Sequence, residues 1–221
     1  MSLQNLYEKI RADKRVIDEY GNIKENEKTS KFAFATHDLS HINRVINNCE
    51  KLSKLLKLDG EKIAEIKIAA LLHDIGCASG GKGGHAERSY IWVKKYFEDV
   101  TIKDNVRDSI LLAIKQHSGI ADDLVGKILA VADKVDICKE RILPLGLLME
   151  GNKEYSHLLS VDFDVREQSL IVQFTSNKKI NMRAINDYYF TKKVFDVIHD
   201  LAKCLELTTI ILIDDKNWEI K

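Results

Sequence analysis

Five stretches of the chain each place a histidine or an aspartate among apolar residues. They contain His41, the adjacent pair His73-Asp74, His85, His117 and Asp133. The pair ends an almost wholly apolar run, and burying a carboxylate without a partner is costly unless a cation neutralises it. Mixed imidazole and carboxylate ligands suit Mn, Fe, Zn or Co, and Mg less well. Any one of these residues alone would more often be an ordinary hydrogen-bonded side chain, but the set favours a divalent-metal site.

A glycine-rich stretch follows the pair directly. Residues 76–83, "GCASGGKG", nearly match the phosphate-binding pattern G-x-x-x-x-G-K-[ST]. The last position is Gly83, which lacks the hydroxyl that would bind magnesium, and the preceding residues favour a helix over the required strand. These departures argue against a nucleotide-triphosphatase loop. The stretch can still hold phosphate through backbone N–H groups and Lys82, or it is a plain solvent loop.

The dipeptide His-Asp is weak evidence alone, because it occurs three times in the chain. One copy, His199-Asp200, lies on an amphipathic helical pattern with no glycine loop nearby, which indicates a solvated helix face. His157 we also interpret as a surface or packing residue.

The expected elements form two parts. Apolar spacing predicts helices over 37–57, 61–75, 85–98, 104–117 and 121–140. The last third predicts a β-hairpin over 160–176 with its turn near Glu167-Gln168, a helix over 184–205 and a strand over 207–214. The only proline, Pro144, suggests the boundary. We therefore expect a mainly α fold: a helical domain of residues 1–145 and a small α+β extension of residues 146–221 packed on it.

Composition excludes some function classes. The chain has 34 basic and 34 acidic residues, so its zero net charge gives no field that favours nucleic acid or membranes. No apolar run is long enough to span a bilayer, and the charged start is unlike a signal peptide. We expect a cytoplasmic protein whose scattered cysteines are mostly buried free thiols.

The combined pattern resembles the HD family of metal-dependent phosphohydrolases. Its H…HD…D order appears as His41 in "HDLSHINRV", His73-Asp74 in "LLHDIG" and Asp133 in "VADKVD". Many members carry two further histidines between the pair and the last aspartate, and His85 and His117 stand there. The resemblance covers about residues 30–140 and implies a helical HD-domain bundle with one or two divalent ions.

The resemblance also implies roles for individual residues. His41, His73, Asp74 and Asp133 would hold one metal, and His85 and His117 a second that Asp74 bridges. We assign Asp74, Asp133 and Lys82 as catalytic. Candidates to contact substrate, chosen from position, are Arg44, Lys82, Lys115, His37 and Asp136. His37 is either substrate-facing or a support for a ligand. Asp136 either orients a ligand or contacts substrate, and an ordinary surface role for it stays open.

The resulting hypothesis is hydrolysis of a nucleotide or another small phosphorylated substrate, by attack of a metal-bound water on phosphorus. The alternative is a non-catalytic metal or nucleotide sensor. A helical nucleic-acid module is disfavoured by the charge balance. An iron-dependent oxygenase on the same scaffold and a homo-oligomer both stay open.

Overall fold

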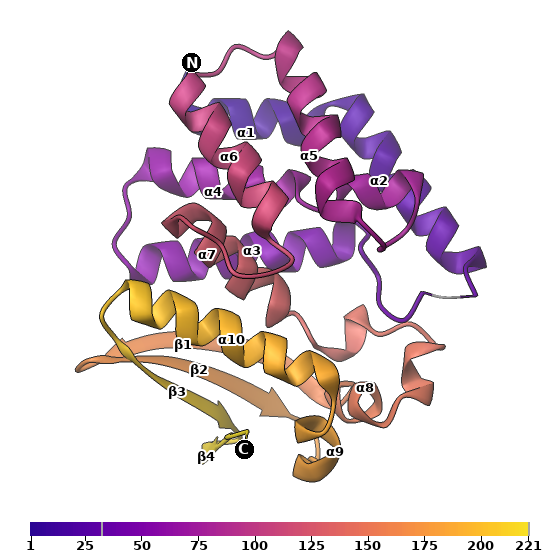
Figure 1. The fold of residues 1–221 in the computed structure, drawn as a ribbon, viewed down its shortest axis with the longest axis vertical. Helices are drawn as coiled ribbons and strands as arrows, with labels where there is room; N and C mark the ends of the chain where they lie inside the picture. Colours follow the sequence, from indigo (N-terminus) through magenta and orange to yellow (C-terminus); the bar gives the residue numbers. More distant parts are fainter. Residues whose placement is uncertain (32, 221) are drawn as a thin grey trace.

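The structure is a computed structural model that describes residues 1–31 and 33–220. Its N-terminal part is a helical bundle (Figure 1). The helices are α1 Leu3–Ala12, α2 Lys14–Thr29, α3 Leu39–Leu55, α4 Gly60–Leu72, α5 His85–Tyr96, α6 Asp104–Gln116 and α7 Leu124–Lys134. Short 3-10 turns follow α4, α5 and α7.

Helix α4 is the centre of this bundle. It packs against α1, α3, α6 and α7. Its residues Ile66, Ile68 and Ala69 are fully buried, as expected of a helix that is apolar nearly all round. Because α4 is enclosed, His73 and Asp74, which follow it directly, are buried as well.

The bounds of helices α3 to α7 differ from expectation by at most three residues, except at the end of α7. Helix α3 begins at Leu39, where the Asp38 carboxylate accepts a hydrogen bond from the Ser40 N–H and caps the helix. Helix α7 ends at Lys134, six residues before the end that apolar spacing predicts. The apolar residues beyond it lie buried in a loop. In this loop the Arg141 carbonyl accepts a hydrogen bond from the Thr36 N–H at 2.8 Å. Periodicity reports burial, and it cannot separate a helix from a buried loop.

The C-terminal part is a small α+β layer. It contains α8 Glu150–Tyr155, β1 Leu158–Arg166, β2 Ser169–Ser176, α9 Met182–Asn186, α10 Tyr189–Cys204, β3 Thr208–Ile213 and β4 Lys216–Asn217. The sheet order is β1-β2-β3-β4. Strands β1 and β2 form the expected hairpin, with Arg166 opposite Ser169 across the two-residue turn. The chain then crosses through α10 to place β3 parallel to β2.

Helix α10 joins the two parts. It lies between the sheet and the bundle, in contact with β3 on one side and α7 on the other (Figure 1). Buried residues of α10 and β2 belong to the same hydrophobic core as those of α4 and α7. The fold is therefore mainly helical with a small C-terminal α+β extension, as the sequence predicts.

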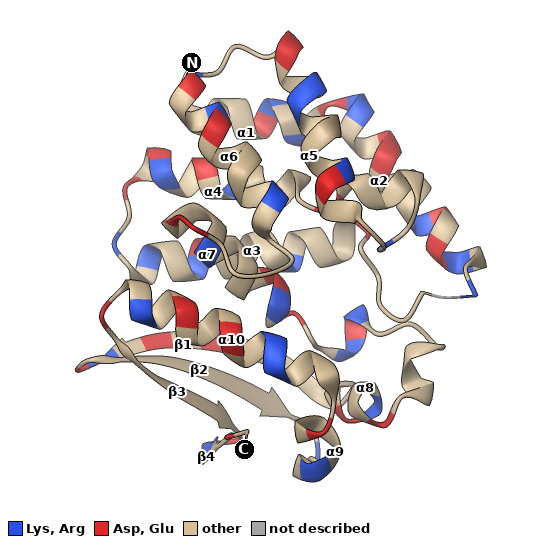
Figure 2. Cartoon of the chain, viewed as in Figure 1, with Lys and Arg blue, Asp and Glu red and all other residues tan. Residues whose placement is uncertain are grey.

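Charge is spread evenly over the chain. Basic and acidic residues alternate along the helices instead of gathering on one element (Figure 2). Among the described residues, no helix combines the length and the apolar character that crossing a bilayer would require.

Candidate metal centre

Five segments far apart in sequence deliver the histidines and aspartates to one point. His41 lies in the first turn of α3, His73 and Asp74 follow α4, and His85 opens α5. His117 follows α6, and Asp133 lies in the last turn of α7. All six side chains are buried. The structure thus brings together every residue that the sequence suggested as a metal ligand.

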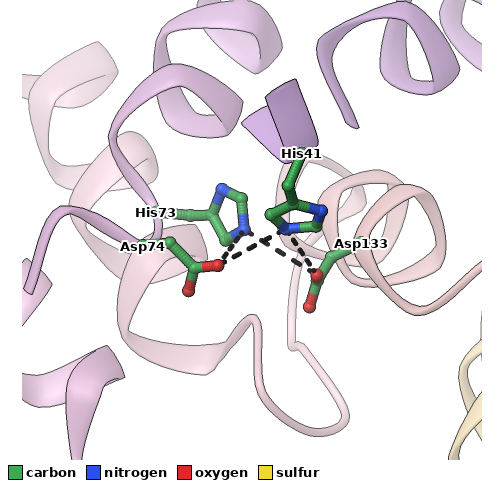
Figure 3. A group of neighbouring side chains, drawn as sticks. All are labelled: His41, His73, Asp74 and Asp133. Carbon is green, nitrogen blue, oxygen red and sulfur yellow. Dashed lines mark ion pairs between the residues drawn. The ribbon is translucent and has the colours of Figure 1, made fainter. Parts of the chain in front are cut away.

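Four of them form a first group (Figure 3). His41 Nε2 lies 3.4 Å from Asp74 Oδ2 and 3.3 Å from Asp133 Oδ1. His73 Nε2 lies 3.2 Å and 3.8 Å from the same two oxygens. The four donor atoms lie within 4.8 Å of one another, so one ion can contact all of them.

Hydrogen bonds from Nδ1 fix the orientation of both histidine rings in this group. His41 Nδ1 donates to Asp136 Oδ2 at 2.6 Å, and His73 Nδ1 donates to the Ala70 carbonyl at 2.8 Å. When Nδ1 carries the proton, a neutral imidazole has its lone pair on Nε2. Both Nε2 atoms are buried without a hydrogen-bond partner. Buried polar atoms without partners are costly, and a cation facing them removes that cost, so this group fits a divalent metal.

A second group consists of Asp74, His85 and His117. The Nδ1 atoms of the two histidines donate to the carbonyls of Lys82, at 2.7 Å, and of Ile114, at 2.6 Å. Their Nε2 atoms then face each other at 2.9 Å, and lie 3.1 Å and 3.3 Å from Asp74 Oδ1. Two lone pairs at that distance repel unless a proton or a cation lies near both. The second group therefore also fits a metal, and Asp74 is the residue that both groups share.

Electrostatics differ between the two groups. Burial opposes charge on His73, but without a metal the carboxylates of Asp74 and Asp133 outweigh it and raise the pKa of His73 to about 10, so a metal ion that binds Nε2 has to displace a proton from it. For His117 desolvation dominates and lowers the pKa to about 4. The Asp74 carboxyl is also desolvated, yet the surrounding imidazoles hold its pKa well below its usual range. Asp74 is thus an ionised carboxylate that the neighbouring imidazoles stabilise.

Two buried cations that the sequence analysis missed act on Asp133. Lys134 Nζ pairs with Asp133 Oδ2. Arg141 Nη1 donates to Asp133 Oδ1 at 3.2 Å and to the Asp133 and Asp136 carbonyls. Lys134 is adjacent to a suggested ligand and could have been noticed from the sequence. Nothing in the sequence singles out Arg141, because it lies beyond the helix on which Asp133 sits.

The centre borders two cavities. The smaller, of about 330 Å³, is lined by Asp74, His85 and Asp133 together with Lys82 and Lys193. The larger, of about 700 Å³, lies beside it, and Lys82 lines both. Lys82 is exposed, but partial desolvation, with Arg141 and Lys134 nearby, lowers the pKa of its ammonium group to about 8.

The residues suggested as substrate contacts are placed differently from one another. Lys82 and His37 line both cavities, and Asp136 lines the larger one. Asp136 is 3% exposed and holds His41, so the surface role left open for it is wrong. Arg44 lines neither cavity; its Nε donates to Asp136 Oδ1 at 2.8 Å.

Lys115 also lines neither cavity. Its ammonium lies over the Tyr90 ring, 4.9 Å from the centroid, and 3.8 Å from a carboxylate oxygen of Glu87. Its suggested contact with substrate therefore has no support in this geometry.

Comparisons with known proteins match part of this chain to one family model. Residues 38–137 match the family model of the HD domain. The chain is similar to a solved structure described as a predicted HD superfamily hydrolase from an uncultured Thermotogales bacterium. That match has 27% sequence identity and a TM-score of 0.43, and covers 59% of this chain and 73% of the other. Among curated proteins no match is found. All six side chains of the two groups lie within the residues that match the HD-domain model.

Proposed function

We propose that the protein is a metal-dependent phosphohydrolase that acts on a nucleotide or another small phosphorylated molecule. The observation that carries the proposal is the pair of buried donor groups that share Asp74 at the wall of a cavity. HD-domain proteins resemble one another in this donor set, and metal-dependent hydrolysis of phosphate esters is the activity that the resemblance implies.

The cations around the smaller cavity support a phosphate substrate. Lys82 and Lys193 line it, as do Lys134 and Arg141. Lys134 and Arg141 are already paired with Asp133, whereas Lys82 and Lys193 have no ion pair among the described residues and lie over the rings of Phe190 and Tyr189. Ammonium groups near a cavity attract phosphate oxygens, so these two lysines are the ones free to hold the substrate.

A divalent ion at such a site lowers the pKa of water and neutralises charge on phosphoryl oxygens. The side chains of this protein supply the rest. Asp136 keeps the His41 proton on Nδ1 and so keeps Nε2 available as a ligand. Lys82 orients the substrate so that phosphorus faces Asp74. Cleavage breaks the bond from phosphorus to the leaving oxygen and forms one to the oxygen of water, whose proton passes to the leaving oxygen.

The test is turnover of phosphate esters by protein of defined metal content. The chelated protein is reloaded with Mn, Fe, Co, Zn or Mg and assayed with an aryl phosphate and a panel of nucleotides. We expect turnover with at least one metal, and at least a hundredfold less for Asp74→Ala. His199→Ala is the matched control, because His199 is exposed and bonded to Thr209 on the opposite part of the fold.

Two outcomes would contradict the proposal. Full activity of the Asp74→Ala protein would show that the shared carboxylate has no catalytic part. Tight binding of metal and nucleotide without turnover of any ester would favour the sensor instead.

A further inference from the structure

The larger cavity has aromatic walls supplied by both parts of the chain. Aromatic side chains that line it are Phe34, Tyr155, Tyr188, Tyr189 and Phe190. All but Phe34 come from the C-terminal part, at α8 and the start of α10. A volume of about 700 Å³ is well above what a phosphate group needs and falls within the usual range of small-molecule sites. The C-terminal extension therefore contributes a wall to the site of the HD domain.

His37 lies where this cavity meets the smaller one, and it lines both. Its ring centroid is 5.9 Å from that of His41 and 6.3 Å from that of His85. It belongs to neither metal group. A ligand atom that touches His37 would therefore lie only a few bonds from a phosphorus held at the metal groups.

The proton of the His37 ring is fixed by Glu27. Glu27 Oε1 accepts from the His37 backbone N–H at 2.8 Å and from His37 Nδ1 at 2.7 Å. Glu27 Oε2 accepts from the Thr36 hydroxyl at 2.8 Å. Above the pKa of about 7 to which burial raises it, Glu27 is a carboxylate whose oxygens only accept, so Nδ1 is the proton donor of this pair. The Nε2 atom then carries a lone pair and can accept a hydrogen bond.

That lone pair has no partner within the described residues. His37 is 5% exposed, and its Nε2 is buried without a hydrogen bond. Burial also lowers the pKa of the ring well below its usual value, so His37 is neutral and accepts at Nε2. A buried acceptor at the border of a cavity is satisfied when a ligand donates to it.

We propose that the larger cavity binds the organic part of the substrate, a nucleoside with its base against the aromatic walls, and that His37 accepts a hydrogen bond from a sugar hydroxyl. This inference rests on the proposed function for the position of the phosphate, and it adds how the substrate is selected. A hydroxyl fits His37 better than a base N–H does, because His37 lies near the metal groups, whereas Phe34, Tyr155 and Tyr188 line only the larger cavity.

Such an acceptor discriminates against a ligand that lacks the hydroxyl. The deoxy analogue would leave Nε2 buried and unpaired, which costs roughly tenfold or more in affinity. A pocket lined only by aromatic rings would show almost no preference, because loss of one hydroxyl changes little apolar contact.

The experiment is direct binding, independent of turnover. Dissociation constants are measured by calorimetry, with and without metal, for the four ribonucleosides and for their 2′-deoxy and 3′-deoxy counterparts. We expect at least one ribonucleoside to bind, with about tenfold weaker binding of one deoxy counterpart. In His37→Phe, which keeps a ring but lacks the acceptor, we expect the preference to fall below about twofold. His199→Phe is the control and should keep the wild-type preference, and circular dichroism checks folding of both.

The outcomes separate this inference from the proposed function. Equal binding of ribonucleosides and deoxynucleosides to the wild-type protein overturns it without any variant. Turnover of an aryl phosphate by a protein that binds no nucleoside also overturns it and leaves the hydrolase standing. A hydroxyl preference that depends on His37, in a protein that hydrolyses no ester with any metal, supports the pocket and rejects the hydrolase.

Discussion

Asp136 supports the metal centre without belonging to it, and its removal isolates what that support contributes. Its carboxylate accepts from His41 Nδ1 at 2.6 Å and from Arg44 Nε at 2.8 Å, one oxygen each. In Asp136→Asn the shape is kept but only one oxygen is left. The amide nitrogen must then face one of two donors, His41 or Arg44.

The cost follows from which donor is lost. If His41 loses its acceptor, its ring is free to rotate or to move its proton to Nε2, and the first group loses a ligand. Removal of a partner that orients a ligand typically weakens metal binding by about 10- to 100-fold, or about 1.4 to 2.7 kcal/mol. The loss of charge adds to this, because the Asp136 carboxylate no longer raises the basicity of the imidazole.

The assay is competition between the protein and a chromogenic chelator for Zn or Mn, at a pH where both proteins are folded. We expect the dissociation constant of the tighter site to rise by about 10- to 100-fold in Asp136→Asn. Asp200→Asn is the matched control, because it also breaks a partly buried ion pair, with Lys127, but far from the centre. A folded Asp136→Asn protein that binds metal within twofold of wild type would refute the reasoning.

Three further predictions concern the neighbours of the centre. Burial raises the pKa of Glu27 from 4.5 to about 7, so between those pH values Glu27 is protonated in the folded chain and ionised in the unfolded chain. The free energy of unfolding therefore falls as the pH rises through this range, by about 3 kcal/mol in total. Urea unfolding at pH 5 and pH 8 should show that loss in wild type but not in Glu27→Gln, and equal losses in both would contradict it. His85→Ala should lower the metal content from two ions per chain to one, and Asp74→Ala should lower it further, by elemental analysis; equal contents would contradict the shared role of Asp74. Because the pKa of Lys82 is lowered to about 8, Lys82 loses its charge between pH 7 and pH 9. Over that range the affinity of the wild-type protein for inorganic phosphate should fall about tenfold more than the affinity of Lys82→Met, as measured by calorimetry.

Much of the centre could be predicted from the sequence because its ligands sit at helix ends that are locally encoded. His73 and Asp74 follow an apolar helix, and His85 opens the next one. Residues at such places point beyond the helix, so their order along the chain was enough to suggest that they meet. Local patterns served less well beyond α7, where the expected helix continued to residue 140 but the chain instead forms a loop. Because that loop was not predicted, the role of Arg141 was not predicted either.

The sequence by itself determined which residue types are available as ligands, that most of the chain is helical, and where the hairpin turns. Only the tertiary structure decided which nitrogen of each imidazole is free, since His41 depends on Asp136, 95 residues away, and His37 depends on Glu27 from another helix. It also decided that α10 supplies aromatic walls to a cavity of the HD domain. The physical reason is that periodicity reports which face of one element is buried, whereas hydrogen-bond direction and cavity shape arise from contacts between elements distant in the chain.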